Sequence, residues 1–123
     1  MEESNNWFRQ AQADLQTANN SLKSGDFYAS VFWSQQAVEK SFKAIIIKNN
    51  GKLIKTHDLV RLGKLTNIPK EFSTKIKELA SAYTESRYGI GIDSIPADEF
   101  DKEVASRLIS FSKEVIEWSK KQI

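Results

Sequence analysis

The chain contains a single histidine, His57, and a carboxylate follows it directly at Asp58. An imidazole with a neighbouring carboxylate is the usual composition of a general base. Thr56 can cap a short helix beginning at His57, and the free backbone amides at a helix start can bind an anion. Two structural roles compete with chemistry, because Asp58 also complements a helix dipole and His57 can anchor a loop through a hydrogen bond. The residues alone leave both interpretations open.

A second candidate for chemistry is the pair Arg87-Tyr88. A guanidinium offers planar donors suited to phosphate, and a tyrosine ring can stack on a base. The structural alternative is an arginine that is salt-bridged across the fold and a tyrosine that closes a helix against the core. If the helix that carries Arg87 ends near residues 55–60, His57 and Arg87 would form a composite site.

A third set of polar side chains lies on the predicted central helix. Gln36, Lys40 and Lys43 share one face at helical spacing, with Glu39 beside them. Amide and ammonium donors next to a carboxylate can hold a phosphate, or they can pair with a second copy in a dimer. The alternative is an ordinary surface ladder in which Glu39 and Lys43 form an i,i+4 pair.

The charge of the chain is concentrated in one region. Residues 39–64 contain seven basic and two acidic groups, Lys55 among them, although the whole chain has a net charge of only +2. This excess can attract phosphates or an acidic partner, or it can be a solvated helix face with a lysine-rich loop. With one histidine and no cysteine, the chain supplies no metal-ligand set, and we expect no metal and no cofactor.

Apolar periodicity predicts an all-α fold, an antiparallel up-and-down bundle of four long helices plus a short extra helix. We expect long helices at about 7–24 and 26–50, a short one from His57 to Lys64, and two more starting at Pro69 and Pro96. The central helix is apolar on two sides, which is typical of a helix between neighbours. The chain is expected to form a single domain over residues 1–123. The polar N-terminus and the short apolar run at residues 44–47 favour a cytoplasmic protein without a membrane segment.

Two motifs occur together in the chain, QxxEKxxKA at residues 36–44 and THDL at residues 56–59. They are accompanied by Ala11-x-x-Asp14-Leu15, Gly25-Asp26-Phe27-Tyr28 and Tyr83-x-x-x-Arg87-Tyr88. Together these segments resemble a stand-alone prokaryotic HEPN domain (higher eukaryotes and prokaryotes nucleotide-binding), and the pairing of the first two motifs is the specific part. The resemblance implies a helical bundle that often dimerises and is often encoded beside a minimal nucleotidyltransferase, the two forming a toxin–antitoxin module.

Many members of this family are metal-independent ribonucleases with an arginine followed four to six residues later by a histidine. Here Arg87 is followed by Tyr88-Gly89-Ile90-Gly91-Ile92-Asp93, without a histidine. We therefore expect first an interaction module, a homodimer that binds a nucleotidyltransferase and nucleotide or RNA through the central helix and residues 50–64. The alternatives are a ribonuclease with a composite Arg87/His57 site and a nucleotide-binding domain without turnover. The resemblance makes Gln36, Glu39, Lys40, Lys43, Lys55, Asp58 and Tyr88 the expected ligand or partner contacts.

Overall fold

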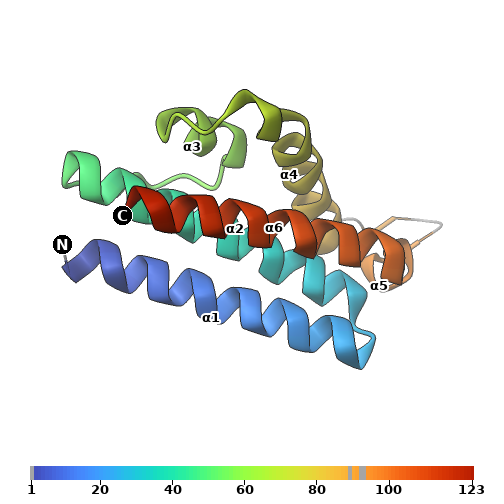
Figure 1. Ribbon diagram of the computed structural model, residues 1–123. Coiled ribbons are helices and arrows are strands. Elements are labelled where there is room, and N and C mark those ends of the chain that lie inside the picture. Colours follow the sequence, from blue (N-terminus) through green and yellow to red (C-terminus); the bar gives the residue numbers. More distant parts are fainter. Residues whose placement is uncertain (1, 89, 92–93) are drawn as a thin grey trace.

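The computed structural model describes residues 2–88, 90–91 and 94–123, and for residues 85–88 it describes the backbone alone. The described residues form helices and their connections, without a strand. In chain order the elements are α1 (Glu2–Ser24), α2 (Phe27–Asn50), α3 (Leu59–Leu65), the 3-10 turn η1 (Lys70–Phe72), α4 (Ser73–Tyr88), α5 (Pro96–Glu99) and α6 (Lys102–Gln122) (Figure 1). The all-helical fold class expected from the sequence is confirmed.

Two glycines end the first two long helices. Gly25 has a φ of +85° and Gly51 a φ of +72°, a left-handed conformation that glycine adopts without steric cost. The Gly51 N–H donates to the Ile47 carbonyl and so closes the end of α2. Asp26 occupies the N-cap position of α2, as expected, but its carboxylate accepts from the Ser24 hydroxyl rather than capping the helix.

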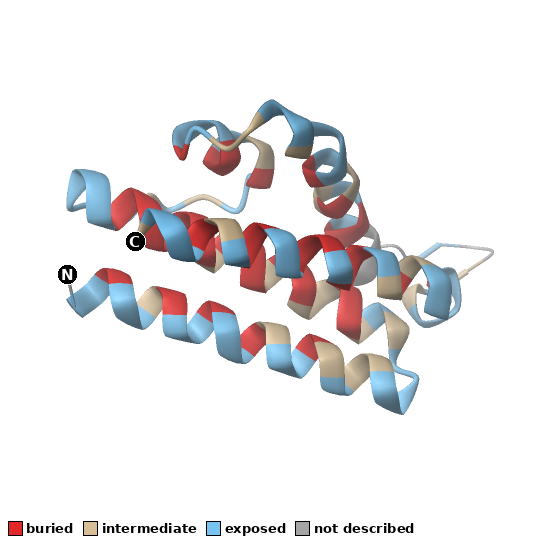
Figure 2. Ribbon diagram, viewed as in Figure 1, coloured by how far each residue is buried: buried red, intermediate tan, exposed pale blue. Residues whose placement is uncertain are grey.

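Helix α2 is the central element of the fold, as its two apolar stripes predicted. It packs against α1, α3, α4, α5 and α6. Residues 41–47 are all buried, which is about two consecutive turns without an exposed position (Figure 2). Helices α1, α2 and α6 lie alongside one another, whereas α4 crosses them (Figure 1).

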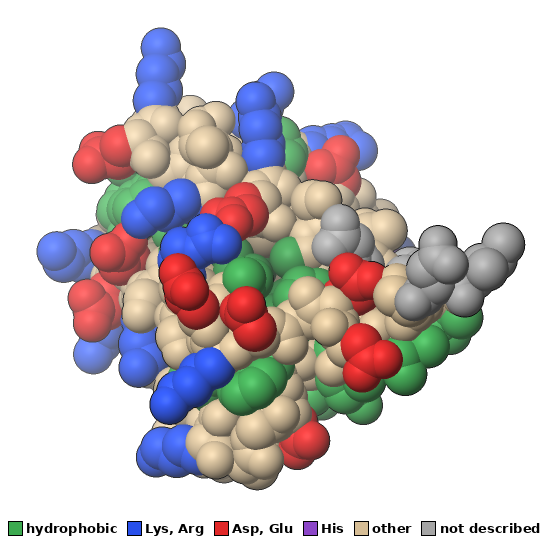
Figure 3. All heavy atoms as spheres, turned by 90° about the vertical axis from the view of Figure 1, so that its right-hand side faces the viewer, with side chains coloured by type: hydrophobic (Ala, Val, Ile, Leu, Met, Phe, Trp, Pro, Cys, Tyr) green, Lys and Arg blue, Asp and Glu red, His purple; other side chains and the backbone are tan. Residues whose placement is uncertain are grey.

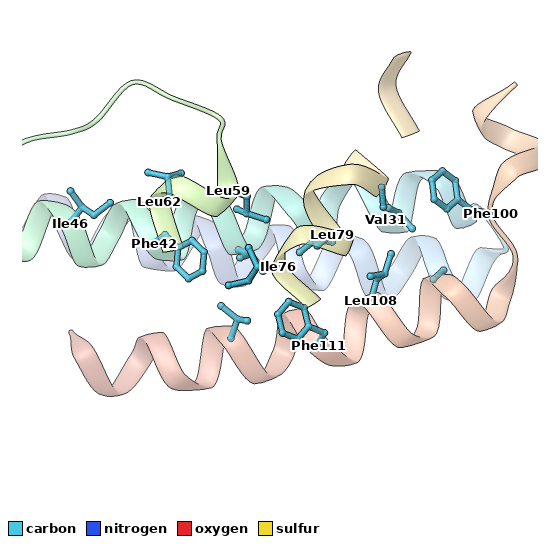
Figure 4. Packing of buried hydrophobic residues seen from close by; sticks show 14 residues of the cluster. Val31, Phe42, Ile46, Leu59, Leu62, Ile76, Leu79, Phe100, Leu108 and Phe111 are labelled. Atoms are coloured by element: carbon cyan, nitrogen blue, oxygen red, sulfur yellow. The ribbon is translucent and has the colours of Figure 1, made fainter. Parts of the chain in front are cut away.

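The main core fills the space between α2, α3, α4 and α6. Phe42 from α2 lies among Leu62, Ile76 and Phe111 from the other three helices (Figure 4). Each of these side chains is almost fully withdrawn from water, and a buried side chain of this size contributes roughly 1.5–3 kcal/mol by the hydrophobic effect. This packing holds the segment between α2 and α3 close to the middle of α2.

The short third helix begins later than expected. Its N-cap is Asp58, whose carboxylate accepts from the Arg61 N–H at 3.1 Å, so α3 starts at Leu59 rather than at His57. Thr56, the expected cap, instead accepts from the Asp58 N–H at 3.1 Å. A carboxylate caps a helix at least as well as a threonine hydroxyl, which explains the difference. His57 therefore lies before the helix, in the connecting segment.

The helix expected at Pro69 starts later than predicted, whereas the helix expected at Pro96 starts there but is interrupted. Pro69 precedes the 3-10 turn η1, and α4 begins at Ser73. The helix that starts at Pro96 stops after one turn, because Phe100 is extended with φ −114° and ψ 127°. Asp101 then caps a new helix by accepting from the Val104 N–H at 2.9 Å. Of the positions expected to be buried in the last helix, Phe100, Leu108, Phe111 and Val115 are buried, whereas Val104 and Trp118 are partly buried.

Candidate functional site around Glu39 and His57

His57 is held by a carboxylate from the central helix. Its Nδ1 lies 3.0 Å from Oε2 and 3.1 Å from Oε1 of Glu39. The Glu39 side chain is 4% exposed, whereas the His57 side chain is 70% exposed. Because a carboxylate accepts, Nδ1 carries the hydrogen, and in the neutral ring the lone pair is on Nε2. A carboxylate on Nδ1 orients an imidazole so that Nε2 can take or give a proton.

Asp58 does not take this part. The sequence suggested Asp58 as the carboxylate beside His57, but its side chain caps α3. The hydrogen bonds therefore support the structural role of Asp58 at the start of a helix. The carboxylate that contacts the imidazole ring belongs to Glu39, eighteen residues before His57 in the chain.

Glu39 is surrounded by donors. Lys43 Nζ donates to Oε2 at 2.9 Å, and Gln35 Nε2 donates to Oε1 at 3.3 Å. Gln36 contacts Glu39 only through Gln35, because Gln36 Nε2 donates to the side-chain oxygen Oε1 of Gln35 at 2.9 Å. The Glu39–Lys43 pair considered from the sequence is confirmed, but it is buried and not a surface ladder. A buried carboxylate needs such partners, because desolvation costs several kcal/mol per ion.

Lys40 belongs to a second network, built on α1. Its Nζ forms a salt bridge with Asp14, and Gln10 Nε2 donates to the other oxygen of the same carboxylate at 3.0 Å. Asp14 is buried, whereas Lys40 is partly exposed. Asp14 was not among the site residues predicted from the sequence. The sequence does contain a signal for it, because Asp14 shares a helical face with Ala11 and Ala18. A carboxylate on a buried face predicts a buried partner.

The structure thus brings Glu39, Lys43 and His57 together and sets Lys40 apart from them. It also adds Trp7, because Lys43 Nζ lies 5.8 Å from the centre of the Trp7 ring, within cation–π range. Among the described residues, every buried side-chain nitrogen and oxygen has a hydrogen-bond partner. The polar residues of this region are therefore held in fixed positions.

The ammonium groups of Lys40 and Lys43 point to carboxylates, so the exposed positive charge of residues 39–64 lies elsewhere. The exposed basic residues of this region are on the end of α2, on the connecting segment and on α3, namely Lys48, Lys52, Lys55, Arg61 and Lys64. Lys55 is two residues before His57. The face seen from the α5 end differs, because acidic and basic side chains are interspersed over it (Figure 3). Lys52, Lys55 and Arg61 lie within five residues of His57 in the sequence, and they are called the basic surface around His57 below.

Arg87 and Tyr88 form the last turn of α4, and their side chains lie outside the described part of the structure. The backbone nevertheless shows where that turn is. Helix α3 packs beside the start of α4, with Gly63 facing Ile76, and Arg87 follows Ile76 by about three turns. The end of α4 lies toward α5 (Figure 1). Arg87 is therefore about three turns of α4 beyond the point where α3 packs on this helix.

Comparison with known proteins identifies the family. Residues 4–123 match the sequence profile of the HEPN domain. The chain belongs to the HEPN domain family. Over 127 aligned positions this HEPN chain is 29% identical to "Putative toxin MJ1304" of Methanocaldococcus jannaschii, and the match covers 90% of the chain and 82% of that relative.

Two solved structures are similar to this HEPN chain. ST0689, described as an archaeal HEPN homologue, has 28% sequence identity and a TM-score of 0.81, with 97% of the chain and 96% of that protein covered. TT1696 from Thermus thermophilus has a TM-score of 0.90 at 22% identity over the full length of both chains, a likeness of fold. None of the helices described combines the length and the apolar character that crossing a bilayer requires.

Proposed function

We propose that this HEPN protein is the toxin-type component of a toxin–antitoxin pair, that it acts as a homodimer, and that its partner is a minimal nucleotidyltransferase. Family membership over residues 4–123 supports the proposal, and so does the similarity to a relative whose name describes a toxin. The nucleotidyltransferase and the dimer come from the family resemblance. Nucleotide or RNA binds, in this proposal, at the basic surface around His57.

The observation that carries the proposal is the exposed imidazole of His57 on the buried carboxylate of Glu39. Here Nδ1 is occupied and Nε2 is left for a ligand, with Lys52, Lys55 and Arg61 exposed nearby in the chain. Cationic side chains of this kind bind the phosphate backbone of nucleic acids without regard to sequence.

In this proposal the protein partner contacts the same segment, where two large apolar side chains are exposed. Leu53 is 36% exposed and Leu65 is 45% exposed, one before and one at the end of α3. Light scattering at micromolar concentration tests the homodimer directly. A mass of twice 14.0 kDa is expected, and the mass of one chain would contradict it.

Growth of a bacterial host tests the proposed toxin. Expression of the wild-type chain alone should slow growth, and co-expression of the nucleotidyltransferase encoded next to it should restore growth. Cells that express the His57→Ala variant without the partner should grow normally. Asp58→Asn is the matched control, because asparagine caps a helix as well as aspartate, and this variant should remain toxic. Equal toxicity of the wild type and His57→Ala at equal expression would contradict a role for His57.

A metal-independent ribonuclease is the second candidate function, and the Glu39–His57 contact favours it. His57 Nε2 would accept the proton of a ribose 2′-hydroxyl, whose oxygen attacks the adjacent phosphorus. The P–O5′ bond breaks and water protonates the leaving 5′ oxygen, which gives a cyclic 2′,3′-phosphate and a 5′-hydroxyl, and His57 then returns its proton to the solvent. Arg87 would stabilise the charge of the phosphorane.

The ribonuclease candidate requires His57 and Arg87 to act as a unit. His57→Ala, Arg87→Ala and the double variant should therefore fall to similar residual rates. Purified protein is incubated with single-stranded and structured RNA, with and without chelator, and the product ends are analysed. Cyclic-phosphate ends formed in the presence of chelator support the candidate. Full activity of His57→Ala, or 5′-phosphate ends that need a metal, would contradict it.

A further inference from the structure

A groove lies between α1 and α2, and Trp7 is one of its lining residues. Its volume is about 400 Å³, and it is lined by Glu3, Asn6, Trp7, Gln10 and Lys40. The groove is open to solvent rather than enclosed. One wall is the indole of Trp7, and the other lining residues carry polar groups.

The buried carboxylate of Asp14 fixes two of these polar groups. It accepts from Gln10 Nε2 at 3.0 Å and from Lys40 Nζ. Because only the amide nitrogen of Gln10 can donate to a carboxylate, its Oε1 is oriented away as an acceptor. Glu3, which is exposed, adds a second acceptor. The lining is mainly apolar, and the Gln10 and Glu3 side chains add oxygen acceptors to the residues beside the Trp7 ring.

Trp7 is linked to His57 through two buried side chains. The Trp7 ring centre is 5.8 Å from Lys43 Nζ, Lys43 Nζ is 2.9 Å from Glu39 Oε2, and that oxygen is 3.0 Å from His57 Nδ1. The indole and the imidazole are therefore no farther apart than these three lengths laid end to end. In a straight line, a base stacked on Trp7 would therefore lie within a few nucleotide lengths of His57.

We propose that this groove binds a nucleobase that carries an exocyclic amino group, stacked on Trp7 with the amino group donating to Gln10 Oε1 or Glu3. Stacking on aromatic side chains is how proteins hold unpaired bases, and the acceptors select a base edge that donates. The inference rests on the proposed function, since it names the base subsite of the surface around His57. Uracil has no exocyclic amino group and should bind less well.

Affinity measurements test the groove with defined probes. The probes are 5′-AMP and 5′-UMP by calorimetry, and single-stranded A8 and U8 RNA by fluorescence anisotropy. The adenine probes should bind more tightly than the uracil probes. Trp7→Leu, which keeps an apolar contact but removes the stacking surface, should weaken A8 binding by about tenfold or more. Trp7→Phe should give an intermediate affinity, because a smaller ring still stacks.

Gln10→Ala and Gln12→Ala form a matched pair, since both remove an amide from α1 and Gln12 is exposed away from the groove lining. Gln10→Ala should lower the affinity for adenine and reduce the preference over uracil, and Gln12→Ala should change neither. Circular dichroism checks that each variant is folded. If the protein binds A8 but not 5′-AMP, and the variants change A8 binding as expected, the base comes from RNA. If the protein binds both probes, a free nucleotide suffices.

The outcomes that overturn the inference differ from those that overturn the proposed function. If folded Trp7→Leu and Gln10→Ala bind A8 as the wild type does, the groove is not the base site and the surface around His57 stands. If the loss occurs but adenine and uracil probes bind equally, the selection of an amino group is wrong. If the wild type binds no probe, the groove and the RNA-binding part of the function both fail, and the growth test decides the rest.

Discussion

The closest approach of Glu39 and His57 is 3.0 Å, and it joins a buried carboxylate in the middle of α2 to an imidazole on the surface. The same carboxylate oxygen accepts from Lys43 at 2.9 Å. Glu39 thus neutralises a buried ammonium and orients an exposed ring at once. Stability and function are expected to depend on this residue in different ways, and substitutions can separate the two.

Glu39→Gln should destabilise the fold by about 3 kcal/mol, because it leaves the buried Lys43 ammonium without its charged partner. Adding Lys43→Met should recover part of the loss, since a neutral pair has no charge to desolvate. Urea unfolding of the two single variants and the double variant measures this coupling. If the double variant is destabilised by the sum of the single effects, the pair does not interact as described.

The second buried pair should respond unequally to loss of one partner or the other. Lys40→Met leaves the Asp14 carboxylate buried with Gln10 alone, and it should cost about 3 kcal/mol. Asp14→Asn leaves Lys40, whose side chain is 21% exposed and can reach water, so a cost of about 1 kcal/mol is expected. Thermal unfolding of both variants at the same pH checks the order. The reverse order would contradict the assignment of Asp14 as the buried partner.

Asp58 should matter as a helix cap and not as a catalytic group. Asp58→Ala removes the hydrogen bond from the Arg61 N–H and should cost about 1 kcal/mol. Asp58→Asn should keep both stability and activity, because asparagine accepts the same bond. Unfolding measurements on the two variants, together with the RNA-binding assay, test this. Loss of binding in a stable Asp58→Asn variant would show that the charge at Asp58 is needed.

Much of the fold could be predicted from local sequence, because caps and apolar spacing act over a few residues. Gly25 and Gly51 ended their helices where the sequence indicated, and the core positions of α2 and α6 followed from periodicity. Local competition limited the helix starts. Asp58 and Thr56 can both cap a helix, so the sequence does not decide between them. At the other end of the chain, the extended Phe100 separates two helices, but the apolar spacing there is the same as in one continuous helix.

The candidate site could be predicted only in part. Glu39, Lys43 and His57 were chosen as polar residues capable of chemistry, but their contact depends on the path of the segment between α2 and α3, which local spacing does not specify. The burial of Lys43 and the pairing of Lys40 with Asp14 depend on how α1 packs on α2. These contacts turned two lysines expected on a binding surface into internal partners.

The salt dependence of RNA binding tests most directly the central claim that the functional surface surrounds His57. Two triple variants lose the same charge from exposed positions, Lys52→Ala/Lys55→Ala/Arg61→Ala near His57 and Lys102→Ala/Lys113→Ala/Lys121→Ala on α6. In a plot of log affinity for A8 against log salt concentration, the first should reduce the slope by about 2, since each phosphate contact in single strands contributes roughly 0.7. The α6 variant should keep the wild-type slope. Equal slopes for both variants would contradict the account.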